Sequence, residues 1–408
     1  MQKEVKLAMA GGKPVRKKPF PKYPVFGNEE IKAAIRVIKS GKLCAQVGKE
    51  VEAFEREFAA YHGIGHAIAV SNGTTALHTA IAACGIGVGD EVIVPPYTFL
   101  ATATSVLMQN AIPVFADIER ETLGLDARCV EKNITRNTRG IIIVHMNGYP
   151  AAHLEEILEM AKRRKIFIIE DCSHAHGAEY KGKKAGTFGD ISIFSFQQKK
   201  NLSLGEGGMI ITPARDLDEK ARAFRAFGNL PLAYNYRMTE LHGAIGRVRL
   251  KQLDRQNAVR RKNAEYLDKK LTGIRGIVPQ LPHPGTKPVY YNYVVKYNEK
   301  ALGVSRKDFI AAIEAEGIPL PLIYTPLYRH PTFQIKDAYN KGCPFSCPYY
   351  KYTRKPVYED GACPVAEETC DRANIEIKIH PPAATNDMAD IVKAFKKVAA
   401  VLQEQRRK

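Results

Sequence analysis

Residues 165–208 read KIFIIEDCSHAHGAEYKGKKAGTFGDISIFSFQQKKNLSLGEGG, and this stretch decides the fold. Two runs within it, 165–171 and 190–196, are short and mostly apolar, which is typical of strands that are covered on both faces. Asp171 closes the first run, and Lys200 stands shortly after the second, before a glycine-rich turn. Buried strands of this kind occur mainly in parallel sheets with helices on both faces, so the stretch predicts an α/β fold.

Five further β-rich runs lie on either side of this stretch, and helical segments separate several of them. The runs are 66–72, 91–96, 112–118, 140–148 and 207–213. Helical patterns occupy 51–61, 74–85 and 153–165. Strands that alternate with helical crossovers indicate one large, seven-stranded, mainly parallel sheet flanked by helices.

The pattern divides the chain into three parts. Residues 1–25 contain four prolines and two adjacent glycines, which predicts an extended N-terminal arm. Residues 26–267 form the predicted large domain, and a long basic helical stretch, 240–267, leaves it. Residues 268–408 are richer in Pro and Tyr and begin with a β-rich run, 289–297, so we expect a smaller α+β C-terminal domain there.

Length and composition describe an ordinary globular protein. Of the 408 residues, 45% are hydrophobic and 25% are charged, which excludes a mostly disordered or fibrous chain. No stretch approaches the roughly 20 consecutive apolar residues that a membrane helix requires. The N-terminus holds only a very short apolar run and shows no secretory signal, so we expect a cytoplasmic protein without a membrane partner.

The chain is strongly basic, with a formal net charge of +18. Such an excess suits nucleic acid, a membrane surface or an acidic small molecule. The basic residues are spread along the chain, and no nucleic-acid-binding module or base-stacking aromatic pattern accompanies them. We therefore expect no nucleic-acid partner, and we interpret the charge as a solvated surface with a phosphate-rich ligand or cofactor.

Eight cysteines in a long chain without a signal indicate mostly reduced thiols. Four of them, Cys343, Cys347, Cys363 and Cys370, lie close together in the sequence. Their spacing does not match the tight pairs of a structural zinc site, so we expect no metal. Zinc binding and disulfide bonding remain minor alternatives.

Four strand ends carry residues that suit ligand binding at the carboxyl edge of the sheet. Residues 71–75, SNGTT, follow the first strand and open a helix, where the glycine permits a tight turn and free backbone N–H groups with a Thr hydroxyl suit a phosphate. Tyr97 and Phe99 follow the next strand, and an aromatic side chain there could lie flat against a ring-shaped cofactor. The third strand ends in Glu170 and Asp171, and an acid there is costly to bury without a cationic partner. Lys199 and Lys200 follow the fourth, and a desolvated lysine there becomes a usable amine. Each feature alone is more typical of ordinary structure than of a site, but together they predict a pocket for pyridoxal phosphate.

The sequence also resembles the DegT/StrS-type sugar (or cyclitol) aminotransferases, which are fold-type I enzymes that use pyridoxal phosphate. The resemblance covers almost the whole chain and is most specific over residues 169–208. It includes the segments GGKPVRKKPFPKYP, EAFEREFAAYHG, SNGTTALHTA, GDEVIVPPYTFLATA, YNYRMTELHGAIG and CPVAEETC.

The resemblance implies a role for each matching residue. Lys200 matches the lysine that forms the Schiff base, and only the motif alignment prefers it to its neighbour Lys199. Asp171 matches the carboxylate that pairs with the pyridine nitrogen. The other matches are Gly73, Thr74, Thr75 and Ser195 around the phosphate, Phe99 stacked on the ring and His174 beside the ring hydroxyl. Asn235 matches a residue that reaches the phosphate of the neighbouring subunit's cofactor, which implies a homodimer with shared active sites.

The resemblance further implies transfer of an amino group from glutamine or glutamate. The acceptor would be a keto-sugar, possibly nucleotide-linked, or a keto-cyclitol such as an inosose. The segments GCPFSCPYY and CPVAEETC are most similar to the cyclitol enzymes, whereas the positive charge favours a phosphorylated or nucleotide-linked acceptor. Arg237, Tyr324 and Arg329 are candidate substrate contacts, although mobile surface residues explain them equally well.

Three alternative functions remain. A pyridoxamine-dependent sugar dehydratase shares the fold, but those relatives carry histidine where this chain has Lys200. An aminobenzoate-type synthase uses the same fold and lysine to dehydrate and aromatise a cyclic amino-ketone. A non-catalytic DNA-binding regulator would explain the positive charge, although the intact Lys200 and Asp171 argue against it.

Overall fold

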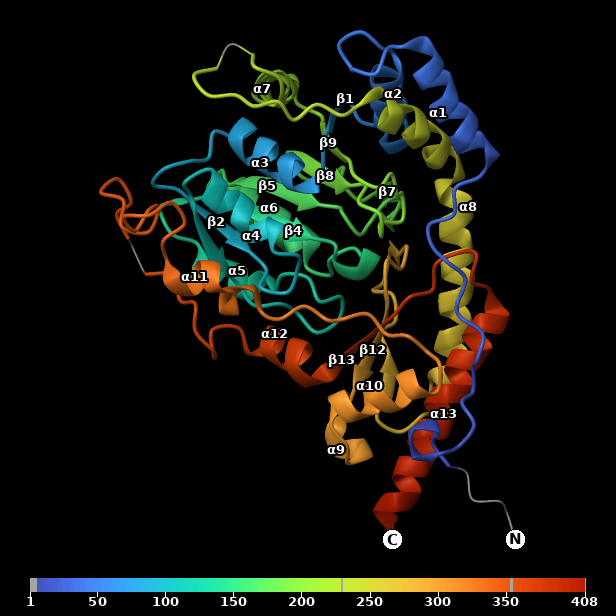
Figure 1. Ribbon diagram of the computed structural model, residues 1–408. Coiled ribbons are helices and arrows are strands. Elements are labelled where there is room, and N and C mark those ends of the chain that lie inside the picture. The colour runs from blue at the N-terminus through green and yellow to red at the C-terminus, as the bar shows by residue number, and fades with distance from the viewer. Residues whose placement is uncertain (1–5, 229, 353–354, 408) are drawn as a thin grey trace.

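The computed structural model describes residues 6–228, 230–352 and 355–407. Seven strands form one sheet in the order β1-β9-β8-β5-β4-β2-β3, and β9 alone runs antiparallel to its neighbours (Figure 1). The strands are β1 His66–Val70, β2 Glu91–Val94, β3 Ile112–Phe115, β4 Thr138–Val144, β5 Phe167–Asp171, β8 Ile191–Ser195 and β9 Gly208–Thr212. The predicted seven-stranded, mainly parallel sheet is confirmed.

Helices cover both faces of this sheet because its strands are apolar on both sides. In β1, Ile68 and Val70 belong to one core, whereas Ala67 and Ala69 belong to the core on the opposite face. The first face packs against α3 Gly73–Ala83, α4 Ala101–Met108 and α7 Arg215–Arg225. The second packs against α2 Glu50–His62, α5 Ala127–Asn133, α6 Leu154–Arg164 and α8 Glu240–Leu271.

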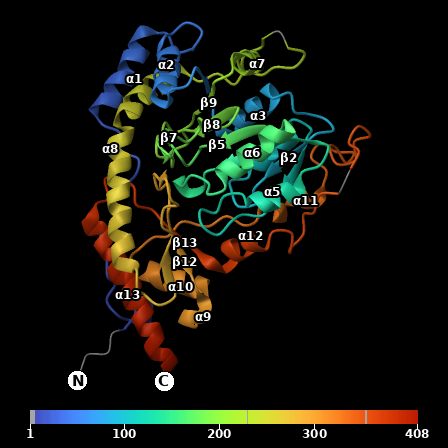
Figure 2. The same ribbon diagram turned by 180° about the vertical axis from the view of Figure 1, so that it is seen from behind.

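Helix α8 begins where the basic helical stretch was predicted to begin and extends four residues further, to Leu271. The side chain of Thr239 caps its N-terminus by accepting from the His242 N–H. One end of α8 packs on α1 Asn28–Ser40 and α2, and α13 Thr385–Arg407 packs along it (Figures 1 and 2). Because α8 ends at Leu271, it runs across the proposed boundary at residue 267, and it contacts both parts of the chain.

The C-terminal part has a small antiparallel sheet of its own. It consists of β10 Ile277–Pro279, β12 Tyr293–Tyr297 and β13 Asn374–Ile377. The remaining helices of this part are α9 Glu299–Leu302, α10 Arg306–Ala315, α11 Pro331–Ile335 and α12 Pro364–Glu368, with the short turns η3 Leu327–Arg329 and η4 Thr369–Ala373. A third small sheet joins β11 Thr286–Lys287 to β6 Glu179–Tyr180 and β7 Lys183–Lys184.

The β-rich run 289–297 is a strand only from Tyr293 onward. Tyr290 has a positive φ of 49°, which interrupts the extended backbone. The N–H groups of Val289 and Asn292 donate to carbonyls of Gly148 and Asn147, in the turn η2 Met146–Gly148. The start of the run is therefore held against the large sheet instead of pairing within the small one.

The N-terminal arm is extended apart from one short turn, η1 Ala8–Ala10, and lies alongside α8 and α13 (Figure 1). Its residues 1–5 are outside the described ranges. The buried Glu316 carboxylate accepts from the arm's Ala8 and Val15 N–H groups, and Arg16 pairs with Asp387 and Asp390 of α13. None of the described helices has the length and apolar character needed to cross a membrane.

Candidate active site

A cavity of about 890 Å³ opens at the carboxyl edge of the large sheet. Strands β1, β2, β5 and β8 run in the same direction, so the loops that follow them converge there. The cavity is lined by most of the predicted site residues: Gly73, Thr74, Thr75, Phe99, Asp171, His174, Ser195, Lys200 and Tyr324. The sheet topology therefore brings together residues that lie far apart in the sequence.

The turn after β1 presents the N-terminus of α3 to the cavity. The Asn72 side chain accepts from the Thr75 N–H, and the Thr75 hydroxyl donates to the Asn72 carbonyl at 2.9 Å. Because the cap occupies Thr75, the free N–H groups of the helix are those of Gly73 and Thr74. A Cβ on Gly73 would lie 2.7 Å from the Ser195 Cβ, so only glycine leaves this cradle open.

Asp171 is the last residue of β5 and is buried. Its carboxylate accepts from the Thr102 hydroxyl of α4 at 3.1 Å and from the Ser173 N–H at 3.0 Å. Within the described ranges, no cationic side chain lies within 4.0 Å of it. The two hydrogen bonds thus orient the carboxylate, but no described cation pairs with it, which suits a cationic ring nitrogen.

Lys200 projects from the turn after β8. The Lys200 N–H donates to the Gln197 carbonyl, and the Lys200 carbonyl accepts from the hydroxyl of Tyr23, in the N-terminal arm, at 2.7 Å. Burial and the nearby Lys199 lower the pKa of the Lys200 amine to about 8, although Asp171 opposes the shift. Lys199 also lines the cavity but is exposed.

His174 stacks on Tyr291, with ring centroids 3.9 Å apart and planes 14° from parallel. Burial, together with the charges of Lys200 and Lys378, holds the pKa of His174 well below its usual range, so the imidazole is neutral. Its Nδ1 is buried and has no hydrogen-bond partner among the described residues. This unpartnered nitrogen and the exposed Phe99 ring suit a polar aromatic ligand between them.

Three predicted residues do not line the cavity. Asn235 is exposed and its backbone bridges Ala226. The backbone of Arg237 bridges Val70 at the end of β1. The Arg329 guanidinium pairs with Asp360 at 2.6 Å and with Asp371 at 2.7 Å, so it is already engaged within the chain.

Among the lining residues that the sequence analysis missed, four carry polar groups that the site uses. They are Thr102, Tyr291, Glu376 and Lys378. Glu376 and Lys378 lie at the end of β13, where the segment NIEIKIH alternates apolar and polar residues. That alternation indicates a strand with one polar face, but it does not reveal which cavity the face lines.

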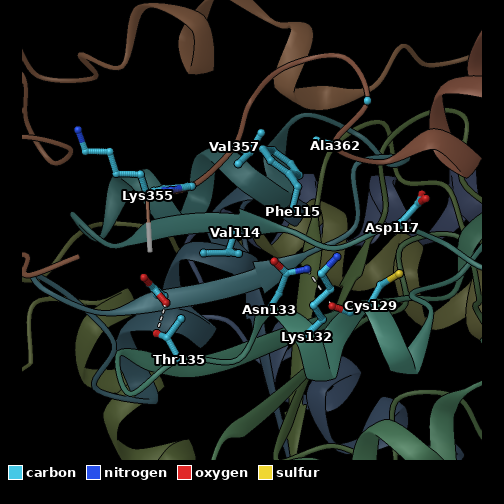
Figure 3. Close-up of a pocket in the computed structure, with 13 residues that line it drawn as sticks. Val114, Phe115, Asp117, Cys129, Lys132, Asn133, Thr135, Lys355, Val357 and Ala362 are labelled. Carbon is cyan, nitrogen blue, oxygen red and sulfur yellow. Dashed lines mark hydrogen bonds between the residues drawn. The ribbon is translucent and has the colours of Figure 1, made fainter. Parts of the chain in front are cut away.

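Two other features do not join this site. A second cavity of about 310 Å³ lies beside β3, where Val114, Phe115, Lys355 and Val357 line it (Figure 3). None of the predicted site residues is among those that line it. All eight cysteines are free thiols, and Cys363 and Cys370 are buried.

The buried atoms His145 Nε2, a Glu170 oxygen and Cys172 Sγ also lie within 4.8 Å of one another. His145 Nε2 lies 2.9 Å from Glu170, whose carboxylate also accepts from the N–H groups of Gly186, Phe188 and Gly189. The Ala151 N–H donates to His145 Nδ1. These bonds explain the cluster as a structural support for β5, without a metal.

The main cavity fits pyridoxal phosphate in its donor set. It offers a helix N-terminus for a phosphate, an un-neutralised carboxylate for a pyridine nitrogen, and a buried amine of lowered pKa for an aldehyde. The fold and the cavity together define a pyridoxal-phosphate-dependent enzyme of the fold-type I class.

Comparisons with known proteins support this class. An L-glutamine:2-deoxy-scyllo-inosose aminotransferase from Streptomyces kanamyceticus is 40% identical over 354 residues, covering 80% of this chain and 82% of that relative. A GDP-perosamine synthase from Caulobacter vibrioides is 40% identical over 299 residues, covering 71% of this chain and 80% of that relative.

Solved structures share the fold over nearly the whole chain. DesV of S. venezuelae, in complex with a ketimine intermediate, has a TM-score of 0.80 and 32% identity, covering 91% of this chain and 94% of that one. The 3-amino-5-hydroxybenzoic acid synthase has a TM-score of 0.83 and 26% identity, covering 95% and 100%.

The chain belongs to the DegT/DnrJ/EryC1/StrS aminotransferase family, whose model matches residues 24–351. It is an enzyme of the transaminase class, and its cofactor is pyridoxal phosphate or the pyridoxamine form. The family and the cofactor predicted from the sequence are confirmed.

Proposed function

We propose that this enzyme moves an amino group from glutamine or glutamate to the ketone of a keto-sugar or keto-cyclitol. The observation that carries the proposal is the buried Lys200 amine of lowered pKa, which shares one cavity with the un-neutralised Asp171 carboxylate. Glutamine and an inosose appear in the name of one relative, and GDP-perosamine in that of another. Both acceptor classes are therefore candidates.

The chain's own residues have defined tasks in this reaction. Pyridoxal phosphate, when bound, supplies an electron sink for the electrons released at the donor's α-carbon. Lys200 would hold the cofactor through Nζ, and the same Nζ, when free, would remove the donor's α-proton. A pKa near 8 leaves part of the amine unprotonated at neutral pH, as a base requires.

Other residues bind and orient the cofactor. Asp171 holds the proton on the pyridine nitrogen, and Thr102 and Ser173 keep its carboxylate in place. Gly73, Thr74 and Ser195 receive the phosphate at the N-terminus of α3. Phe99 and His174 bound the space for the ring.

The test is half-reaction spectroscopy with purified enzyme loaded with pyridoxal phosphate. Addition of glutamine or glutamate is expected to convert the absorbance of the aldehyde form of the cofactor to that of the amine form. A screen of keto-sugars, nucleotide-linked keto-sugars and inososes then identifies the acceptor that restores the original spectrum. No conversion with any amino acid would overturn the proposal.

A second measurement locates the attachment point. Borohydride reduction followed by peptide mass spectrometry is expected to find the pyridoxyl group on Lys200. A pyridoxyl group on the exposed Lys199 would contradict the assignment of Lys200 as the attachment point.

These assays, together with a gel-shift assay, separate the alternative functions. An aminobenzoate-type synthase would release an aromatic product from a cyclic amino-ketone without needing an amino-acid donor. A dehydratase would consume a sugar substrate without net amino transfer, and the presence of Lys200 argues against it. A DNA-binding regulator would show a salt-sensitive gel shift and no transamination.

We further propose a cytoplasmic homodimer with shared active sites and the domain division at residues 25 and 267. Asn235 is exposed and outside its own chain's cavity, which suits a residue that reaches a second subunit. Phe227 and Leu232 on the same loop are also exposed, at 67% and 63%. Exposed apolar side chains on this loop suit an interface between two copies.

A further inference from the structure

Lys378 is a second amine in the cavity, and the reaction steps above give it no task. It follows β13 directly and lines the same cavity as Lys200. Its Nζ lies 3.8 Å from the centroid of the Tyr291 ring, and the Lys200 Nζ lies 4.7 Å from the same centroid. Both amines thus gather around one aromatic ring at the place where the donor's amino group must react.

The Lys378 ammonium has no anionic partner in the described parts of the chain. No carboxylate there lies within 4.0 Å of it, and it donates one long hydrogen bond, 3.4 Å, to the Tyr291 carbonyl. An ammonium carries three N–H donors, so two remain for a ligand.

The nearest candidate partner, Glu376, is occupied by other groups. Its carboxylate accepts from the Tyr97 hydroxyl and from the side-chain amides of Asn147 and Asn292. Glu376 therefore attracts Lys378 only across a distance, without a direct ion pair.

Partial burial of this unpaired cation is unfavourable. Desolvation and the neighbouring Lys200 lower the pKa of Lys378 to about 7. An anion bound at this amine would favour its charged form and recover part of the desolvation cost. The surroundings therefore suit an anionic group of the substrate.

The candidate anions can be separated by position. The cofactor phosphate is assigned to the N-terminus of α3, so it does not occupy Lys378. The amino donor brings an α-carboxylate, bonded to the same carbon whose proton Lys200 removes. Among the other candidate cations, Arg237 and Arg329 do not line the cavity, and Lys199 is exposed.

We propose that Lys378 binds the α-carboxylate of the amino donor and thereby selects amino acids over simple amines. This assignment rests on the proposed aminotransferase function. Lys378 would hold the donor's α-carbon beside Lys200 Nζ, with the Tyr291 ring supporting both amines.

The experiment compares Lys378→Met, which keeps the length and removes the charge, with Lys378→Arg and the wild type, all as holoenzyme. Half-reaction rates are measured with glutamine and with 4-aminobutanamide, which is glutamine without its α-carboxylate. Lys378→Met is expected to lower the apparent affinity for glutamine by about 10- to 100-fold, the typical value of a charge-assisted hydrogen bond. The reaction with 4-aminobutanamide should change little, and Lys378→Arg should restore most of the preference.

A binding measurement supplies a readout that does not depend on turnover. Calorimetric titration with glutaramate, which carries a carboxylate but no amine, should show much weaker binding to Lys378→Met than to the wild type. Neutral glutaramide should bind both equally. Lys199→Met is the matched control, because it removes the same charge from the rim of the same cavity, and it should keep the preference for glutaramate.

The outcomes distinguish the inference from the function on which it rests. If the wild type converts with glutamine and Lys378→Met keeps the full preference for the carboxylate, the inference is wrong and the function stands. An equal loss with both amines, or an equal effect of Lys199→Met, would also reject it. If the wild type reacts with no amino acid, the proposed function itself fails.

Discussion

At the scale of single residues, the protonation of Lys200 depends on charges that act in opposite directions. Burial and Lys199 lower the pKa of its amine, and Asp171 raises it, with a result of about 8. An exposed lysine has a value of 10.5. The amine is therefore unprotonated more readily than an ordinary lysine, which both cofactor attachment and proton removal require.

This balance predicts the pH dependence of Lys200 in the enzyme without cofactor. The ammonium form cannot attack an acylating reagent, so labelling of Lys200 should rise with pH through a midpoint near 8 instead of 10.5. Peptide mass spectrometry after brief acetylation at several pH values measures the midpoint. Lys199→Met should move it upward and Asp171→Asn downward, because the first removes a repelling charge and the second an attracting one. A midpoint at the ordinary value, or two shifts in the same direction, would contradict the account.

At the scale of elements, the phosphate turn depends on a close approach between β1 and β9. A Cβ added to Gly208 at the start of β9 would lie 2.4 Å from the Asn72 carbonyl oxygen. Asn72 caps α3, whose N-terminus lines the cavity. The absence of a side chain on β9 thus helps to place the phosphate turn.

Gly208→Ala should therefore weaken cofactor binding as well as stability. The new methyl group must displace the backbone of Asn72, and overpacking of this kind costs about 1–3 kcal/mol of unfolding free energy. Thermal unfolding of the cofactor-free protein and titration with pyridoxal phosphate measure the two effects. Gly65→Ala is the control, because its nearest atom is the Pro213 oxygen at 3.8 Å, and it should leave cofactor affinity unchanged. Wild-type cofactor affinity in Gly208→Ala would show that the turn does not depend on this contact.

At the scale of the whole molecule, hydrogen bonds join the N-terminal arm, α8 and the C-terminal part to the backbone near the site. Arg260 of α8 donates to the Tyr23 hydroxyl, which donates to the Lys200 carbonyl. Arg260 also donates to His380, two residues beyond Lys378. Segments from both ends of the chain therefore hold the backbone that carries Lys200 and Lys378.

The proposed homodimer predicts complementation between two defective chains. Lys200→Ala should abolish transamination, and Asn235→Ala should weaken cofactor binding if it serves the partner's phosphate. In a mixed dimer, one site contains both intact residues, so activity should return when the two variants are co-expressed. Steady-state assays of the doubly tagged mixed dimer measure it, and light scattering checks the mass. A monomeric protein, or a mixed dimer as inactive as Lys200→Ala, would contradict shared sites.

The large sheet and the main polar residues at the strand ends could be predicted from the sequence because their signals are local. Each strand is a short apolar run, and Gly73, Phe99, Asp171 and Lys200 each stand within a few residues of a strand end. In a parallel sheet those ends meet at one edge, so strand order in space was not needed to group them.

Only the tertiary structure decided the roles that depend on distant segments. Lys378 and Glu376 reach the cavity from another sheet, and Tyr291 does so from an irregular segment that the pattern predicted as strand. Arg329 was a candidate for substrate binding until Asp360 and Asp371 were found beside it. The physical reason is that periodicity records which face of an element is buried, whereas the partner of a side chain depends on how separate elements pack.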